Sequence, residues 1–219
     1  MSEESAKKLR EAIIRGDEET AKDIAKDLVK TELDPLKIIR DYLSPAMRVV
    51  GEKFEKGEYF LMHLMMAGEA MEAVTEILTS AMEQESKEKL RQEREKAKKI
   101  VIGTVLGDIH DIGKNIVSSL LRANGYTVFD VGKDVAPKKF VEKAEEVNAD
   151  MIALSALLTV TLPYQGDVIN LLKEKGLREK YKVIVGGGPT TQEWADEIGA
   201  DGWAPDAIEA MESVKKLIG

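Results

Sequence analysis

The second half of the chain alternates short β-rich runs with helical stretches, and this alternation constrains the fold more than any other feature. From residue 99 onward the runs read KIVIGTV, YTVFDV, MIALSA, KVIVGG and a weaker DGWA, with helical segments between them. Parallel strands need long crossover connections, which such helices provide. The pattern predicts an α/β domain over residues 99–219, with a five-stranded, flavodoxin-like (Rossmann-type) parallel sheet in the order 2-1-3-4-5.

In the first part of the chain, residues 1–84, the apolar residues have a different spacing. Apolar residues recur at helical spacing, with Asp17 and Asp34 placed as N-caps and Gly57 as punctuation before a last helix over about 58–82. We expect an N-terminal four-helix bundle. The residues predicted to be buried are Ala21, Ile24, Ala25, Leu28, Val29, Leu36, Ile39, Leu43, Val50, Phe54, Leu61, Leu64, Met65, Met71, Val74 and Leu78, with Met62 and Met66 as further packing residues.

Residues 85–98 are too polar to bury a core and rich in neighbouring opposite charges, so they are predicted to be a charged linker between the two domains.

Composition excludes several classes of function. The chain has no cysteine, which excludes disulfides, thiolate catalysis and thiolate-bound metal clusters. Its net charge of −8 argues against a nucleic-acid partner. No apolar run approaches the roughly 20 residues that span a bilayer, and the polar N-terminus lacks the pattern of a secretory signal. A cytoplasmic protein without a membrane partner is expected.

Chemistry-bearing residues cluster where predicted strands end. In an open parallel sheet, ligands bind outside the carboxyl ends of the strands. Residues 107–115 follow the first strand, 155–159 the third and 186–188 the fourth. His110 has the imidazole of a transition-metal ligand, and Asp108 could hold the proton of its other ring nitrogen. Taken alone, the pair is better interpreted as an N-cap aspartate beside a solvent-exposed histidine, and the glycines could equally be a turn or a phosphate loop.

The combination is more specific. Asp-x-His-x-x-Gly at a strand-to-helix turn, followed by Ser-x-Leu and Gly-Gly, resembles the cobalamin-binding domain of methionine synthase and its corrinoid relatives, the methyl-carrier proteins. The resemblance implies a cobalamin or related corrinoid bound base-off, with His110 as the axial ligand of cobalt in place of the cofactor's own base. Asp108 and Thr161 would form a proton relay with that ligand; methionine synthase has a serine where Thr161 stands. The remaining residues implied to contact the cofactor are Gly107, Ile109, Asp111, Ile112, Gly113, Ser155, Leu157, Thr159, Gly187, Gly188 and Ala204.

The resemblance extends to the helical part. Residues 50–61, VGEKFEKGEYFL, look like the cap module of methylcobalamin carriers, which implies that Phe54, Leu61 and Leu64 cover the methyl face of the cofactor. Ordinary core packing is the alternative for all three. Relatives often have a proline where this chain has Met62-His63, and His63 is interpreted as a structural or surface residue.

These features predict a corrinoid protein that carries a methyl group between a substrate-specific methyltransferase and a second, acceptor methyltransferase, with a reductive activase as a further partner. The carrier would be a non-catalytic subunit, because the cofactor supplies the chemistry. The alternative is the cobalamin-binding subunit of an adenosylcobalamin-dependent mutase, which shares the motif but not the helical cap. A DNA-binding cobalamin sensor would need a basic module, and a phosphorelay receiver an aspartate where Ser155 stands.

Overall fold

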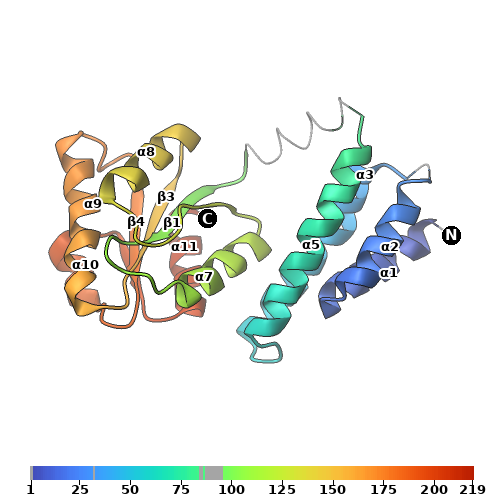
Figure 1. Cartoon of the computed structure of the whole chain (residues 1–219), viewed down its shortest axis with the longest axis horizontal. Helices are drawn as coiled ribbons and strands as arrows, with labels where there is room; N and C mark the ends of the chain where they lie inside the picture. The colour runs from blue at the N-terminus through green and yellow to red at the C-terminus, as the bar shows by residue number, and fades with distance from the viewer. Residues whose placement is uncertain (1, 32, 84–85, 87–95) are drawn as a thin grey trace. The chain divides into compact units, whose positions relative to one another are not determined.

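The computed structural model describes residues 2–31, 33–83, 86 and 96–219 (Figure 1). It divides into two compact units, one of residues 1–96 with 123–125 and one of residues 97–122 with 126–219. Most of the predicted linker lies outside the described residues. Within the described part of the chain, no helix is both long and apolar enough to cross a membrane.

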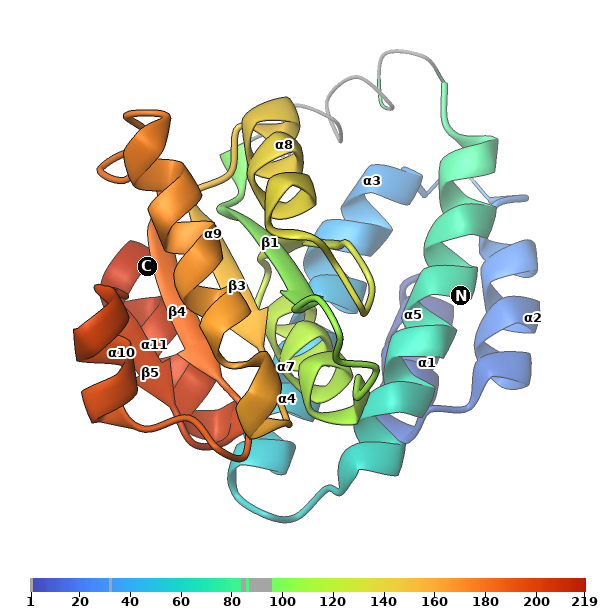
Figure 2. The same cartoon turned by 60° about the vertical axis from the view of Figure 1, so that its left-hand side comes forward.

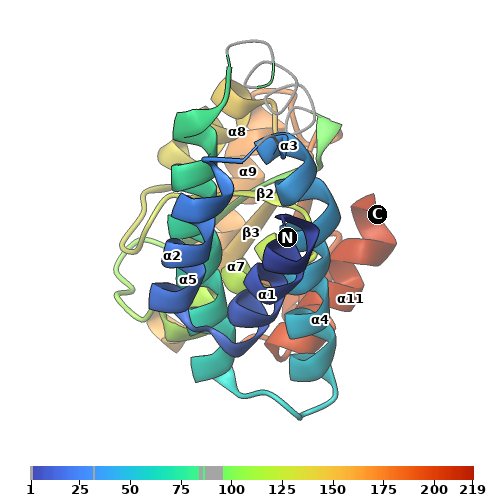
Figure 3. The same cartoon turned by 90° about the vertical axis from the view of Figure 1, so that its right-hand side faces the viewer.

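The first unit is a bundle of helices, as predicted (Figure 3). Its elements are α1 (Ser2–Arg15), α2 (Glu18–Leu28), α3 (Pro35–Ile38), the π-helical segment η1 (Ile39–Leu43), α4 (Ser44–Glu55) and α5 (Leu61–Ala81). Both expected N-caps form: Asp17 accepts the amide of Thr20 at 3.2 Å, and Asp34 accepts that of Leu36 at 3.0 Å.

A π-helical segment interrupts the helix that begins after Asp34. There the amide of Ser44 donates to the carbonyl of Ile39, five residues back. The next residue, Pro45, has no amide hydrogen, and its ring would clash with the carbonyl four residues earlier in a regular α-helix. We attribute the wider π turn to this proline, whose effect the sequence pattern did not reveal.

Helix α5 begins at Leu61 rather than at Glu58. The side chain of His63 accepts the backbone amide of Phe60 at 3.0 Å and stacks on the Tyr59 ring at 4.6 Å, so its role is structural, as expected. The prediction that the methionines at the start of this helix pack inside was wrong for Met62, Met65 and Met66, which are exposed. The reason is the buried stripe of α5, which runs through Leu64, Ala67, Ala70, Val74 and Leu78 and turns these methionines to the opposite side.

The second unit is an α/β sandwich whose parallel sheet has the order β2-β1-β3-β4-β5, which confirms the predicted topology (Figure 2). The strands are β1 (Lys99–Thr104), β2 (Thr127–Asp130), β3 (Met151–Ser155), β4 (Lys182–Gly186) and β5 (Gly202–Ala204). The helical elements are α7 (Ile112–Ala123), α8 (Pro137–Val147), the 3-10 turn η2 (Thr159–Thr161), α9 (Pro163–Glu174), α10 (Gln192–Ile198) and α11 (Ala207–Ile218).

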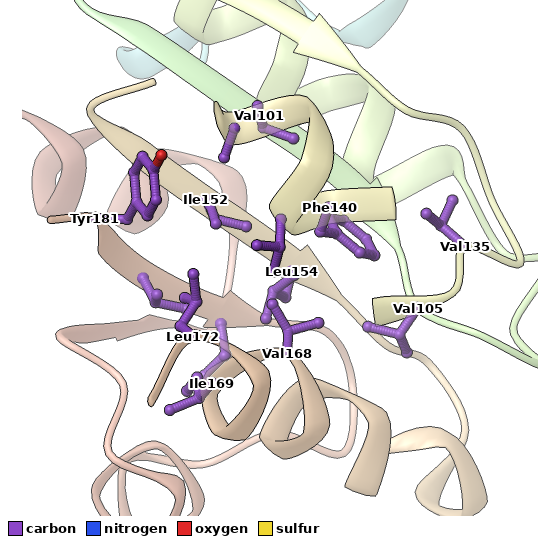
Figure 4. Packing of buried hydrophobic residues seen from close by; sticks show 14 of the residues in the cluster. Val101, Val105, Val135, Phe140, Ile152, Leu154, Val168, Ile169, Leu172 and Tyr181 are labelled. Carbon is purple, nitrogen blue, oxygen red and sulfur yellow. The ribbon is translucent and has the colours of Figure 1, made fainter. Parts of the chain in front are cut away.

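Each face of the sheet has its own core. On one face, Val101, Ile152 and Leu154 pack with Phe140 of α8 and Val168 of α9 (Figure 4). The other face lies under α7 and α11 and contributes Ile100, Ile102, Met151, Ala153, Ile184 and Ala204. Because side chains alternate along a strand, these two sets of residues follow directly from the period of two.

Strand register arranges the α7–α11 face in rows across the sheet. Ile102 pairs with Ala153, which pairs with Ile184. Two residues further toward the carboxyl ends, Thr104 pairs with Ser155, Ser155 with Gly186, and Gly186 with Ala204. We call the first set the lower row and the second the upper row.

Candidate functional site

His110 and Asp108 lie in the loop that joins β1 to α7. One carboxylate oxygen of Asp108 accepts the backbone amide of His110 at 3.0 Å and lies 2.8 Å from Nδ1 of its ring. A neutral imidazole that donates from Nδ1 keeps the lone pair of Nε2 free. Among the described residues Nε2 has no hydrogen-bond partner, and 47% of the side chain is exposed. The imidazole is therefore oriented by the chain and open to a ligand.

Asp108 itself is fully buried. Its second carboxylate oxygen accepts the amides of Leu157 at 2.6 Å and Leu158 at 3.1 Å, and lies 2.9 Å from the hydroxyl of Thr161. Burial alone would raise the pKa of this carboxyl group, but the hydrogen bonds from the His110 and Leu157 amides, the His110 ring and the Leu158 amide outweigh it and hold the pKa well below its usual value. Asp108 is thus a buried anion.

The Thr161 hydroxyl can serve two acceptors. It lies 2.9 Å from the Asp108 carboxylate and 2.8 Å from the carbonyl oxygen of Leu158. A hydroxyl has one hydrogen, so it donates to one of the two at a time. The structure therefore brings together His110, Asp108 and Thr161 in the order that the resemblance implied.

Asp134, which the sequence analysis did not single out, braces this loop. Its carboxylate accepts the amide of Gly107 at 2.7 Å, and its own amide donates to the carbonyl of Asp108 at 2.9 Å. Gly107 has φ +77° and Asp134 has φ +55°. Aspartate tolerates this left-handed region better than most residues, which suits it to this position. Its contact with Gly107 joins two loops that are 27 residues apart, so no local sequence pattern could have revealed it.

A cavity of about 580 Å³ lies beside His110. Most residues that the resemblance assigned to the cofactor line it: Ile109, His110, Asp111, Ile112, Gly113, Ser155, Leu157, Gly187, Gly188 and Ala204. Three assigned residues do not. Gly107 is in the turn before it, Asp108 is buried behind His110, and Thr159 is exposed at the start of η2.

Other walls of the cavity are not among the residues that the resemblance assigned to the cofactor, although Lys114 and Gly186 lie in the predicted rim segments 107–115 and 186–188. They comprise the lower row, Ile102, Ala153 and Ile184, together with Leu154 and Val185 of the strands, Lys114, Ile116 and Val117 of α7, and Gly186, Pro205, Asp206, Ala207 and Ala210. The period of two could have identified the lower row, because the same face carries Ser155 and Ala204.

Glycines shape the cavity for two reasons. A side chain on Gly187 would have its Cβ 1.8 Å from the carbonyl oxygen of Ala156, at a φ of +123° that favours glycine. At Gly113 a Cβ would meet nothing within 4 Å, so this glycine leaves open space at the cavity wall. A chain of hydrogen bonds holds the first of these loops: the Trp203 indole donates to the Thr190 hydroxyl at 2.9 Å, and that hydroxyl donates to the carbonyl of Gly187 at 2.6 Å.

In the helical unit, Phe54 and Leu61 are half-buried and Leu64 is fully buried. The large apolar residues that α5 and its start expose are instead Phe60, Met62, Met65 and Met66. Leu64 therefore follows the core-packing alternative.

The side chains at this site suit a metal ion that is already coordinated by a cofactor. No group of three or more histidine, cysteine or acidic side chains within the described ranges could hold a bare ion. One oriented imidazole beside a large, mainly apolar cavity instead fits a metal already held by a macrocycle with a bulky organic tail.

Comparison with known proteins gives the same assignment. Two family models, both described as a B12 binding domain, match residues 98–212 and 5–79. Dimethylamine corrinoid protein 1 of Methanosarcina acetivorans is 54% identical over 194 residues, covering 89% of this chain and 88% of that protein. A corrinoid protein of Desulfitobacterium hafniense is 48% identical over 211 residues, 96% of each chain.

Solved structures agree. The methanol:cobalamin methyltransferase complex MtaBC from Methanosarcina barkeri contains a chain with a TM-score of 0.82 at 29% identity, matched over 98% of this chain and 80% of that one. The monomethylamine corrinoid protein of the same organism matches with a TM-score of 0.54 at 34% identity over the full length of both chains. The oriented histidine, the cavity and these matches together place the chain in the family of B12-binding corrinoid proteins.

Proposed function

We propose that this protein carries a methyl group on the cobalt of a corrinoid, from a substrate-specific methyltransferase to a second methyltransferase. The proposal rests on the imidazole of His110, which lines the cavity and is oriented by Asp108. Its Nε2 has no hydrogen-bond partner among the described residues. Once bound, the corrinoid supplies the chemistry of methyl transfer at cobalt.

His110 is the proposed axial ligand, with the corrinoid bound base-off. Its Nδ1 proton is held by the buried carboxylate of Asp108, which makes Nε2 a stronger donor to a metal. The cavity between α7 and α11 is the proposed site of the displaced nucleotide tail.

The relay from His110 through Asp108 to Thr161 is proposed to adjust ligation. Because the Thr161 hydroxyl can turn from the Asp108 carboxylate to the Leu158 carbonyl, the number of hydrogen bonds on that carboxylate can change by one. Each such bond lowers the basicity of the carboxylate that holds the imidazole proton.

The partners are proposed from the relatives. One matched structure is that of a methanol:cobalamin methyltransferase complex. A dimethylamine corrinoid protein is 54% identical to this chain in sequence. We infer a substrate-specific methyltransferase as the first partner, an acceptor methyltransferase as the second and a reductive activase as the third, all in the cytoplasm.

The helical unit, residues 1–84, is proposed as a cap for the methyl face, joined through residues 85–98 to the cobalamin-binding domain of residues 99–219. The exposed apolar residues Phe60, Met62, Met65 and Met66 fit such a role better than the fully buried Leu64. The relatives that match both units are named corrinoid proteins, which disfavours the mutase alternative.

Electron paramagnetic resonance of the Co(II) form tests the proposal. With nitrogen-15 histidine in the protein, we expect the axial nitrogen signal to change to the nitrogen-15 splitting, and the signal to disappear in His110→Ala. His63→Gln serves as the matched histidine control and should retain it. A signal from the cofactor's own base in the wild-type protein would overturn the assignment.

A further inference from the structure

The loop that carries His110 has no regular backbone hydrogen bonds at the histidine itself. Residues 108–111 belong to no helix or strand. Within the described part of the chain, neither the amide nor the carbonyl of His110 bonds to another backbone group. Both groups are instead bound by side chains, so side chains determine the backbone conformation of this residue.

Thr104, the last residue of β1, binds the carbonyl of His110. Its hydroxyl donates to that oxygen at 3.1 Å. Thr104 belongs to the upper row and is fully buried, but it is not among the described residues that line the cavity. Its contact with His110 is therefore separate from the wall that would hold the cofactor.

Thr104 is itself firmly held. Its amide donates to the carbonyl of Gly132 at 2.9 Å, and its carbonyl accepts the amide of Val135 at 3.1 Å. Its β-branched side chain has few rotamers, which restricts the direction of the hydroxyl. A buried hydroxyl without a partner costs free energy, which favours the bond to the His110 carbonyl.

Thr104 and Asp108 restrain different parts of His110. Asp108 accepts the His110 amide and binds Nδ1 of its ring, whereas Thr104 binds the carbonyl. The amide belongs to the planar peptide group before the Cα atom and the carbonyl to the one after it. Restraining both planes restrains φ and ψ of the residue. With the ring bound as well, Nε2 has little freedom to move.

We propose, on the basis of the proposed function, that Thr104 is a positioning residue for the axial ligand. Its hydroxyl keeps the His110 backbone in the conformation in which the ring binds Asp108 and leaves Nε2 open to a metal. Because Thr104 contacts the backbone and not the ring, it fixes the place of the ligand, while Asp108 holds the proton of Nδ1. The role depends on the hydroxyl and not on the volume of the side chain.

The first measurement needs no cofactor. The chain has two histidines, so the full-length apoprotein with carbon-13 in its histidine rings gives one NMR signal for His110 and one for His63, which is the internal reference. We expect an order parameter of about 0.85 for the His110 ring in the wild type and a fall toward about 0.6 in Thr104→Val. The value for His63 should not change. Thr104→Ser keeps the hydroxyl and should stay near the wild type.

The second measurement uses the same proteins loaded with cob(II)alamin. Loss of one hydrogen bond changes an equilibrium by about threefold to tenfold, so Thr104→Val should weaken axial ligation by this factor. Co(I) binds a lower ligand poorly, so the Co(II)/Co(I) midpoint potential should rise by about 30–60 mV, at 59 mV per tenfold change. Thr104→Ser should retain most of the wild-type potential.

The matched control is Thr75→Val in the helical unit. The Thr75 hydroxyl also donates to a backbone carbonyl, that of Met71 at 2.7 Å, and its loss should alter neither the His110 ring nor the potential.

The two measurements separate this inference from the proposed function. If Thr104→Val lowers the free energy of unfolding but changes neither the ring order parameter nor the potential, Thr104 is only structural and the inference is overturned. A wild-type Co(II) spectrum without a protein nitrogen would overturn the proposed axial ligand, while the apoprotein still shows whether Thr104 restrains His110. If Thr104→Val does not fold, Thr104→Ala and Thr104→Ser are compared, because they differ only in the hydroxyl; equal order parameters would overturn the inference.

Discussion

At the scale of single residues, Asp108 does more for this site than its position two residues before His110 suggests. Its two oxygens receive the His110 amide and ring, the Leu157 and Leu158 amides and the Thr161 hydroxyl. One buried anion thus joins the loop after β1 to the loop after β3. The histidine is oriented by the same group that fixes the shape of the cavity mouth.

We predict that Asp108→Asn destabilises the apoprotein by about 2–3 kcal/mol, because an amide cannot accept at both ends and hydrogen bonds to a charged group are strong. Urea denaturation measures the free energy of unfolding. Asp111→Asn, which alters a partly exposed carboxylate of the same loop, should change it by less than about 1 kcal/mol. Equal effects of the two substitutions would contradict the structural role given to Asp108.

The motif made Asp108 and His110 predictable from sequence, because chemistry restricts the residue types that can act there. The cavity wall at Ala153 and the contact of Asp134 were not predictable in the same way. An alanine in a buried strand looks like any core residue, and its place in the cavity wall depends on the fold. The contact of Asp134 with Gly107 depends on how two loops meet in space, which no local pattern contains.

At the scale of elements, the loop after β2 supports the loop that carries His110. Asp134→Ala should destabilise the apoprotein by about 1–2 kcal/mol, because it removes the acceptor of the Gly107 amide and puts a poorly suited residue at φ +55°. Asp134→Asn keeps an acceptor and tolerates this conformation, so most of the stability should return. Thermal unfolding, followed by circular dichroism, compares the two variants with the wild type. An unchanged unfolding midpoint for Asp134→Ala would show that the contact of Asp134 with Gly107 does not stabilise the loop.

The opposite end of the sheet depends on Asp201, which accepts the Val183 amide at 2.8 Å and pairs with Arg178 and Lys182. Burial would raise the pKa of this carboxyl group, but these hydrogen bonds lower it below 3.8. Its stabilising effect is therefore complete at neutral pH. The effect declines once the pH falls below 3.8, the ordinary pKa, and is lost as the pH passes through the lower pKa of the folded state.

Asp201→Asn should accordingly destabilise the protein at pH 7 and by less at low pH. Urea denaturation of both proteins at pH 7 and at about pH 3 measures the difference, which we expect to shrink as the wild-type carboxylate takes up a proton. A difference that stays constant over this range would show that the charge of Asp201 plays no part.

The elements themselves were largely foreseen, because the helices of the bundle bury one face and the strands, buried on both faces, are short and nearly continuous apolar runs. The exceptions are informative. The π segment before Pro45 and the late start of α5 both depend on backbone hydrogen bonds, which apolar spacing does not report. The exposed methionines of α5 were misjudged because hydrophobic character alone does not say which side of a helix is covered.

At the scale of the whole molecule, the two units should unfold as separate transitions, and cobalamin should act on them unequally. A ligand that binds only the folded form stabilises it by about 2.7 kcal/mol at a hundred times its dissociation constant. Scanning calorimetry should show that cobalamin raises the unfolding temperature of the unit formed by residues 97–122 and 126–219. A shift of the other transition as well would support the proposed cap role of the helical unit; no shift of either would contradict the location of the pocket.

The hydrogen-bonded chain from Trp203 through Thr190 to Gly187 has a practical consequence. The protein has two tryptophans, and this one is tied to a loop of the cavity wall. Corrin rings absorb at the wavelengths where indole emits. The apoprotein should therefore show stronger tryptophan fluorescence than the corrinoid-bound protein. Cofactor binding can then be measured by this intrinsic fluorescence, without any label.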